Sequence, residues 1–407
     1  MIKIFRLVLL SAILFTGVSA SAQTTTSSPY SQFGLGDIKG LALPQQRGMG
    51  GIGMGLRRPG GYGNINLMNP ASYSAVHITT FDAGGQIGIR QLSKNSITET
   101  GSNASFSHFA FAIPVVRNHS AISFGIVPFS ELGYRYKLPA QIDTHDVNYV
   151  YSGDGGLSKA HFGYGLRIGK NLSIGANVGY IFGKLNQVRA TEFADPSALN
   201  SRIENSNSVG GFTLDYGVQY VANLTGTTKL ILGYAGNNGR QINSTSSSLS
   251  TAWRIVGIDE DSGPLDTLSL VEGSEVKLDM PLTHSFGFAI EKTNYWLVGA
   301  DVNLGQWSDF TAGGVNAGLN NTFGVAVGGQ VTPDPTSVTN YFKLIDYRLG
   351  FKYDKTQVRV RNTDINQYAM TVGLGLPLPA NRTAFYKINF SAELGQRGTL
   401  SNSLVRE

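Results

Sequence analysis

Beyond residue 75 the chain alternates apolar and polar side chains over short segments that are separated by turns. In residues 386–394, Tyr, Ile, Phe, Ala and Leu occupy every second position, with Lys, Asn, Ser and Glu between them. Residues 172–182, 212–220 and 296–304 follow the same rule. A period of two residues is typical of β-strands with one apolar face and one polar face. The pattern therefore predicts an all-β protein.

The alternation and the intervening turns predict thirteen strands. They are expected at residues 79–90, 104–115, 120–139, 146–168, 172–190, 206–222, 228–245, 277–291, 295–307, 320–332, 343–358, 365–377 and 384–396. Short connections such as 117–119 alternate with long connections at 191–205, 246–276 and 308–319. In bacterial outer-membrane barrels short turns face the periplasm, long loops face outward, and the number of strands is even. We therefore expect about fourteen strands. Either the last of them follows Glu407, which we favour, or the count of thirteen is off by one.

Alternation alone does not distinguish a membrane barrel from a secreted, soluble β protein. Many of the expected strands have the ~9–11 residues that a tilted strand needs to cross a bilayer. Aromatic residues lie at the ends of the apolar faces, for example Tyr180, Tyr220, Trp296 and Tyr386, where a barrel has its interfacial girdle. The opposite faces are rich in Gly and Ser. These features favour an antiparallel transmembrane β-barrel.

The first 22 residues have the pattern of a secretory signal peptide. Lys3 and Arg6 precede an apolar run at 7–15, and small residues follow up to Ala22, where we expect cleavage. The protein is therefore expected to be exported. Together with the barrel pattern, this predicts the outer membrane of a Gram-negative bacterium, with outer-membrane lipids as partners.

Composition narrows the function classes. Charged residues make up 14% of the chain, against roughly 25% in soluble proteins. The absence of Cys excludes disulfides, thiolate metal sites and a lipid-anchored cysteine. A net charge of +5 is too small to indicate nucleic-acid binding. The six His show no metal-ligand spacing and we find no catalytic motif, so we expect no enzyme activity, metal or cofactor.

Residues 23–75 differ from the rest of the chain, since they are rich in Gly and lack strand alternation. A barrel of about fourteen strands has room in its lumen for such a segment. Apolar residues such as Tyr30, Leu35 and Ile65 favour an ordered hatch over a disordered periplasmic leader. We therefore expect a hatch at 23–75 and a barrel at 76–407.

This order of elements resembles the FadL-type outer-membrane transporters of long-chain fatty acids and aromatic hydrocarbons. A Gly-rich stretch at 47–53 and then Asn69, Pro70 and Ala71 precede the strands, and in that family a hatch ending near Asn-Pro-Ala plugs a fourteen-stranded barrel. The resemblance implies a channel in which a hydrophobic ligand waits in a pocket and leaves when the hatch shifts, or laterally through a kinked strand. Relatives that do not import lipids, including the PorV-like shuttle barrel of type IX secretion, share this architecture.

Five charged residues on the polar faces are expected to point into the lumen, the part of the bilayer region where charges cost least. They are Arg167, Asp215, Asp301, Lys387 and Glu393. They either pair with one another or with the hatch, or they contact the headgroup of a ligand.

Two functions remain open. The first is passive uptake of a hydrophobic small molecule, which needs an apolar pocket between hatch and wall that the polar strand faces do not obviously supply. The alternative is a non-transport accessory barrel of an outer-membrane secretion or assembly complex that binds partner proteins through its loops. The connection at 246–276 carries Trp253, Ile255, Val256 and Ile258, which could serve a partner or pack across the barrel mouth.

Overall fold

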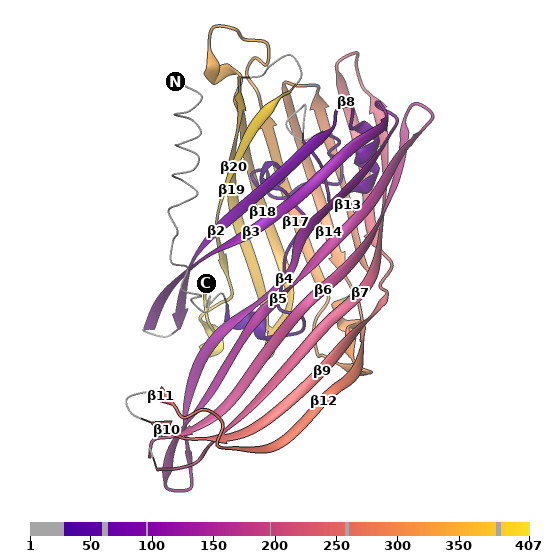
Figure 1. Cartoon of the computed structure of the whole chain (residues 1–407). Coiled ribbons are helices and arrows are strands. Elements are labelled where there is room, and N and C mark those ends of the chain that lie inside the picture. Colours follow the sequence, from indigo (N-terminus) through magenta and orange to yellow (C-terminus); the bar gives the residue numbers. More distant parts are fainter. Residues whose placement is uncertain (1–27, 59–63, 95–96, 196, 257–259, 380–383) are drawn as a thin grey trace, which may run out of the picture.

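The computed structural model describes residues 28–58, 64–94, 97–195, 197–256, 260–379 and 384–407. The predicted signal peptide lies outside these residues. One sheet of 18 hydrogen-bonded strands curves into a barrel (Figure 1). Within the described ranges, no helix is long and apolar enough to cross a bilayer.

Fifteen strands, each paired antiparallel with its neighbours, form the wall. They are β2 (Thr80–Lys94), β3 (Ile97–Val116), β4 (Ser120–Ile142), β5 (His145–Ile168), β6 (Leu172–Phe193), β7 (Asn200–Asn223), β8 (Thr228–Asn237), β9 (Gln241–Trp253), β12 (Asp266–Asp279), β13 (Thr283–Lys292), β14 (Trp296–Gly305), β17 (Thr322–Val331), β18 (Asp346–Val360), β19 (Thr363–Leu378) and β20 (Tyr386–Arg397). The two halves of β7 pair with β8 and β9, which in turn pair with β13 and β12. Therefore β8 and β9 form one interrupted wall strand, and so do β12 and β13.

The remaining elements are short. They are strands β1 (Asp37–Ile38), β10 (Ile255–Val256), β11 (Glu260–Asp261), β15 (Thr311–Ala312) and β16 (Val315–Asn316), helix α2 (Pro44–Arg47), and the 3-10 turns η1 (Pro29–Gln32), η2 (Pro70–Ala75), η3 (Trp307–Asp309), η4 (Tyr341–Lys343) and η5 (Ser401–Ser403).

Each of the thirteen predicted ranges overlaps at least one wall strand, which confirms the all-β prediction. The lengths predicted for two connections were wrong. Strand β6 continues to Phe193 and β7 begins at Asn200, while β9 runs to Trp253 and β12 begins at Asp266. These strands lose their alternation beyond the predicted membrane band because neither face there is required to be apolar, yet the backbone ladder still satisfies their hydrogen bonds.

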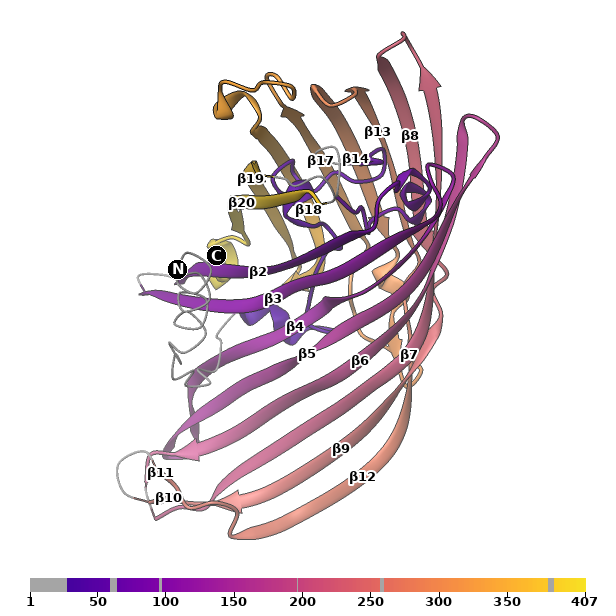
Figure 2. The same cartoon turned by 45° about the horizontal axis from the view of Figure 1, so that its top comes forward.

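The wall is much taller on one side than on the other. Strands β5 and β7 have 24 residues each, whereas β13, β14 and β17 have 10. At about 3.3 Å per residue, 24 residues extend about 80 Å and 10 residues about 33 Å. The outer parts of β4 to β7, with β9 and β12, therefore project past the short strands as a curved sheet, which we call the overhang (Figure 2).

Side chains alternate between the two faces of the wall. In β18, Asp346 and Arg348 are buried inside, whereas Tyr347, Leu349 and Phe351 are exposed outside. The same alternation leaves large apolar side chains exposed around the outer wall. An apolar outer band with a polar interior is the arrangement of a transmembrane β-barrel.

The first and last wall strands meet through the residues after η5. The backbone N–H and C=O of Arg406 bond with Ser93 in β2, at 2.9 and 2.8 Å. Those of Glu407 bond with Arg397 in β20, at 2.8 and 3.0 Å. Both contacts are antiparallel. The structure does not test the prediction of a fourteenth strand after Glu407.

Candidate functional site

The candidate site is the barrel interior, where the N-terminal segment lies against the wall. Residues 28–58 and 64–76 run through the lumen (Figures 1 and 2). Their apolar side chains are almost fully buried; Leu43, Met49, Ile65 and Tyr73 are at most 1% exposed. The segment folds into short turns rather than strands because its frequent Gly residues disfavour extended ladders.

The Asn69-Pro70-Ala71 motif fixes this segment to the wall. The Asn69 side chain accepts a hydrogen bond from Ala71 N–H at 3.1 Å and so caps η2. Its Nδ2 group donates to the carbonyl of Met54 at 3.1 Å and lies 3.3 Å from the carbonyl of Tyr234 in β8. Pro70 suits the first position of the turn because its φ is fixed and its missing N–H is not needed there.

Glycines of the wall provide the space for the segment's backbone. They include Gly175, Gly217, Gly233, Gly328 and Gly350. A Cβ at Gly233 would clash with the carbonyl of Met54, and a Cβ at Gly350 would clash with the backbone of Met49 and Gly50. The Gly residues on the polar strand faces therefore allow close backbone contact between segment and wall.

Polar side chains of the wall bind the backbone of the segment. The Oδ2 atom of Asp301 accepts hydrogen bonds from the N–H groups of Gly53 at 2.6 Å and Met54 at 2.9 Å. Gln219 Nε2 donates to the carbonyls of Met54 at 2.8 Å and Leu56 at 3.0 Å. Irregular backbone buried in a lumen needs such partners. One of the five predicted inward charges, Asp301, therefore contacts the N-terminal segment.

Three of the other predicted charges pair with the wall itself. Asp215 binds Lys159 at 2.6 Å, Lys387 binds Asp346 at 2.5 Å, and Glu393 binds Lys352 at 2.6 Å. Their partners were not predicted. Each of these pairs joins two strands separated by a third, and that adjacency requires the strand order and register of the folded barrel.

The fifth predicted charge, Arg167, lies at the end of β5 beside the N-terminal segment. Arg57 of that segment is buried and donates to Ser173 and Ser74, both at 2.9 Å. Burial lowers the pKa of Arg57 to about 10, and the positive charge of Arg167 adds to this effect. The two residues therefore influence each other by charge repulsion.

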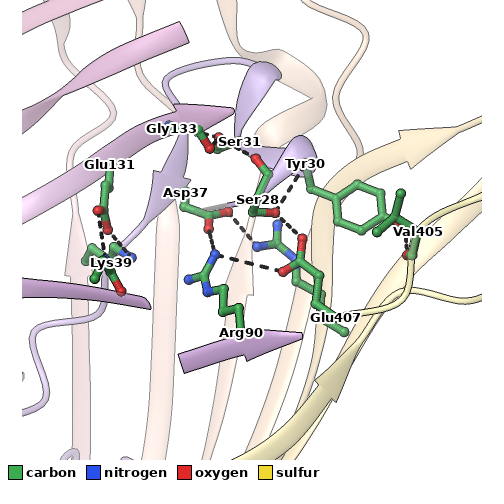
Figure 3. A network of polar contacts seen from close by, with 12 residues as sticks. Ser28, Tyr30, Ser31, Asp37, Lys39, Arg90, Glu131, Gly133, Val405 and Glu407 are labelled. Carbon is green, nitrogen blue, oxygen red and sulfur yellow. Dashed lines mark hydrogen bonds and ion pairs between the residues drawn. The ribbon is translucent and has the colours of Figure 1, made fainter. Parts of the chain in front are cut away.

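A second polar network holds the start of the N-terminal segment (Figure 3). Asp37 binds Arg397 of β20 at 2.5 Å and Arg90 of β2 at 3.4 Å, while Lys39 binds Glu131 of β4 at 2.8 Å. Burial alone would raise the pKa of Asp37, but the charges of Arg397, Arg90 and Lys39 outweigh it and keep the pKa below its ordinary value. Sequence reasoning missed this network because its members are up to 360 positions apart.

An apolar cluster fills the lumen beside the overhang. It comprises Leu35, Leu132, Tyr134, Leu157, Ile181, Leu185, Val209, Ile242, Leu278, Trp307, Phe310 and Leu319. Three of these come from the connection between β14 and β17, where Trp307 is 7% exposed and Phe310 2%. That connection was expected as an outer loop, and it folds back into the barrel mouth. The cluster lies between the N-terminal segment and the wall, where the sequence did not obviously supply an apolar region.

Of the two roles considered for Trp253, contact with a partner or packing within the barrel, the structure agrees with packing. Trp253 ends strand β9 and is 4% exposed, and the guanidinium of Arg202 lies over its ring, 4.8 Å from the ring centre. A ring packed in this way is not available to a partner protein. Ile258 lies outside the described residues, and the structure does not describe the side chains of Ile255 and Val256.

The wall is interrupted between β3 and β4. Their backbone pairing begins where Phe109 lies opposite Ile126 and ends where Val116 lies opposite Ser120, next to the turn that joins the two strands. Beyond it, in the described ranges, residues 97–108 pair with β2 and residues 127–142 pair mainly with β5. Strand β4 bulges between Pro128 and Ser130, and Pro128 has no N–H to donate to a ladder.

The N-terminal segment occupies the free edge of β4 at this interruption. Asp37 and Ile38 pair with Glu131 and Ser130. Ser28 N–H donates to the carbonyl of Gly133 at 2.9 Å. The segment thus supplies hydrogen bonds that a neighbouring wall strand would otherwise supply.

Comparison with known proteins identifies the family. A family model described as BamG matches residues 1–407. The chain belongs to the BamG family. A search of curated proteins found none that matches this chain.

Three solved structures share the fold of this BamG-family chain. The Pseudomonas putida toluene transporter TodX is 14% identical, with a TM-score of 0.52 over 91% of this chain and 98% of that one. A Pseudomonas aeruginosa FadL homologue is 14% identical, with a TM-score of 0.51 over 89% and 90%. The Ralstonia pickettii toluene transporter TbuX is 12% identical, with a TM-score of 0.50 over 87% and 97%. The likeness supports the predicted FadL-type barrel and concerns the fold alone.

Proposed function

We propose that this BamG-family barrel lies in a Gram-negative outer membrane and passes hydrophobic small molecules, fatty-acid-like or aromatic, down their concentration gradient. The observation that carries the proposal is the apolar cluster between the N-terminal segment and the overhang. An apolar lumen gives no advantage to a hydrophilic solute, which would lose its hydration there. A hydrophobic ligand would instead gain the contacts that apolar side chains provide.

In the proposed binding step, a hydrophobic ligand takes the place of the Trp307 and Phe310 side chains in the apolar cluster. Trp307 and Phe310 belong to a connection rather than to a wall strand, so this connection can move outward without breaking the barrel. A ligand that replaces their contacts offsets much of the cost of moving them. The step needs no energy source beyond the gradient.

The N-terminal segment acts in this proposal as the hatch. Asp301 and the Asn69-Pro70-Ala71 motif hold it in the lumen, which prevents leakage of water-soluble molecules. The interruption between β3 and β4 is the proposed exit, since passage there breaks hydrogen bonds to the start of the hatch and spares the ladder between wall strands. The FadL-type fold supports this path by likeness alone.

A binding assay tests the proposal. A fluorescent twelve-carbon fatty-acid analogue is titrated into the purified chain in detergent. We expect saturable binding that Phe310→Ala tightens, because the substitution opens space, and that Leu157→Phe weakens, because it fills space. The exposed Val315→Ala is the control. Absence of saturable binding to the unaltered chain contradicts the proposal. An affinity that stays the same in both cluster variants also contradicts it.

The second candidate is an accessory barrel in an outer-membrane secretion or assembly complex. One observation weakens the case for uptake, and a second favours the accessory role. The BamG family model covers the whole chain, whereas the toluene transporters are only 12–14% identical to it. The overhang also exposes a large sheet beyond the short strands, and residues 266–275 of β12 are exposed along its border.

Affinity purification from membranes separates the two candidates. A protein that co-purifies in a fixed ratio and is lost when Leu268 and Leu270 of β12 are changed to Ser supports the accessory role. Both side chains are more than half exposed, so the barrel should still fold. A co-purified fatty acid or hydrocarbon without such a protein supports uptake.

A further inference from the structure

The connection between β17 and β18 carries exposed apolar side chains. Residues 332–345 include η4, and there Val338 is 96% exposed, Phe342 71% and Tyr341 45%. Large apolar side chains gathered at one surface site usually mark a contact with a protein partner or a membrane. This site lies apart from the lumen and from the overhang, at the top of Figure 1.

Two tyrosine hydroxyls place this connection on the outer side of the wall. Tyr347 is the first outward-facing residue of β18, and its hydroxyl donates to the carbonyl of Phe342 at 3.0 Å. The hydroxyl of Tyr341 donates to the carbonyl of Pro377 in β19 at 3.0 Å. Since Tyr347 points away from the lumen, the backbone that it binds lies on the outer side of the wall too.

Local hydrogen bonds give the connection a defined shape. The Asn340 side chain accepts from the N–H of Phe342 at 3.0 Å and caps η4. The N–H of Asp334 donates to the carbonyl of Lys343 at 2.9 Å, which closes the loop. The apolar side chains are therefore presented by an ordered turn.

The residues around the connection belong to the lipid-facing surface of the wall. Below it on β18, Leu349 is 65% exposed and faces outward, where a transmembrane barrel meets lipid. Beside it, Phe385 is 65% exposed and Tyr386, which begins β20, 54%. The exposed side chains of the connection thus continue the lipid-facing surface at its rim. Aromatic rings beside a cationic Lys are favoured at the boundary between headgroups and acyl chains.

We propose that residues 332–345 form a membrane-interface anchor, in which Val338, Tyr341 and Phe342 insert between the headgroups and acyl chains of a phospholipid leaflet. Lys343, in the last turn of η4, lies where it can meet lipid phosphates. The anchor holds this end of the short side of the barrel at a fixed depth. This inference depends on the barrel fold and is independent of the proposed function.

Spin labelling can test the anchor because the chain contains no cysteine. A nitroxide is attached to Phe342→Cys in the full chain, reconstituted in phosphatidylethanolamine and phosphatidylglycerol bilayers. Leu349→Cys is the control for lipid, and Val315→Cys, 71% exposed in the connection between β14 and β17, is the control for water. Collision rates with oxygen, which concentrates in lipid, and with a water-soluble nickel chelate are then measured.

We expect the label at position 342 to collide more often with oxygen than with the nickel chelate, like the label at 349 and at a shallower depth. We expect the opposite order at position 315. Nickel accessibility at 342 that equals the value at 315 overturns the proposal, because the connection then lies in water. Low accessibility to both reagents also overturns it, because the site is then covered by protein.

Discussion

The attachment of the N-terminal segment to Asp301 can be tested by removing the carboxylate. Asp301 is 1% exposed, and one of its oxygens accepts the N–H groups of both Gly53 and Met54. In Asp301→Ala both N–H groups lose their acceptor while they remain buried. The ladder of β14 uses backbone groups only, so the wall should keep its structure.

The size of the effect follows from the two hydrogen bonds. A hydrogen bond to a charged group contributes about 1.5–3 kcal/mol, so losing two weakens local attachment by about 3–6 kcal/mol. Since each 1.4 kcal/mol is tenfold, amide exchange at these two positions should accelerate by about two to four powers of ten. Hydrogen–deuterium exchange of a peptide that contains both residues measures this directly. The temperature at which the barrel unfolds in detergent should change little.

Asp301→Asn is the matched control. Its amide oxygen can still accept both N–H groups without the charge, so exchange should accelerate far less than in Asp301→Ala. Unchanged exchange in the Ala variant would refute the reasoning, since Asp301 would then not hold the segment. Equal acceleration in both variants would also refute it, because the effect would then come from charge rather than from the two hydrogen bonds.

Two further predictions concern contacts of the same segment, and a third concerns the apolar cluster. Gly217→Val places a side chain against Asn69 and should displace the motif, seen as faster proteolysis of the N-terminal segment; Gly226→Ala, in open space, should change nothing. Because ion pairs depress the pKa of Asp37, their stabilisation should be complete above pH 3.8 and fade as the pH falls toward the depressed value. Amide exchange against pH should show this loss, and Asp37→Asn should abolish the dependence. Trp307→Ala should destabilise the apolar cluster by about 3–5 kcal/mol, measured by denaturant unfolding; an unchanged midpoint contradicts the packing.

The strands were predictable because their pattern is local. A strand with lipid outside and a lumen inside must alternate, as residues 386–394 do, and this periodicity is visible without any partner. The prediction failed where the environment changed. Residues 200–205, 246–253 and 266–276 extend beyond the predicted membrane band, where water contacts the sheet. Their polar residues were taken for loops, although the backbone ladders continue there.

The candidate site was predictable only in part. Asp301 was expected to face the lumen, but the atoms that it binds could not be named, since Gly53 and Met54 lie about 250 positions away. The apolar cluster was missed for a related reason. Trp307 and Phe310 come from a connection whose direction depends on the height of the neighbouring wall strands.

The amino-acid sequence by itself determined which residues alternate, where the turns fall, and that a Gly-rich segment precedes the strands. These properties depend on neighbours in the chain and on the two solvents that a strand separates. The tertiary structure alone decided the heights of the wall's two sides, the pairs of buried charges, and the contact of wall glycines with the backbone of the N-terminal segment. Those properties depend on register and closure, because residues far apart in sequence become neighbours only when the sheet curves around the segment that it encloses.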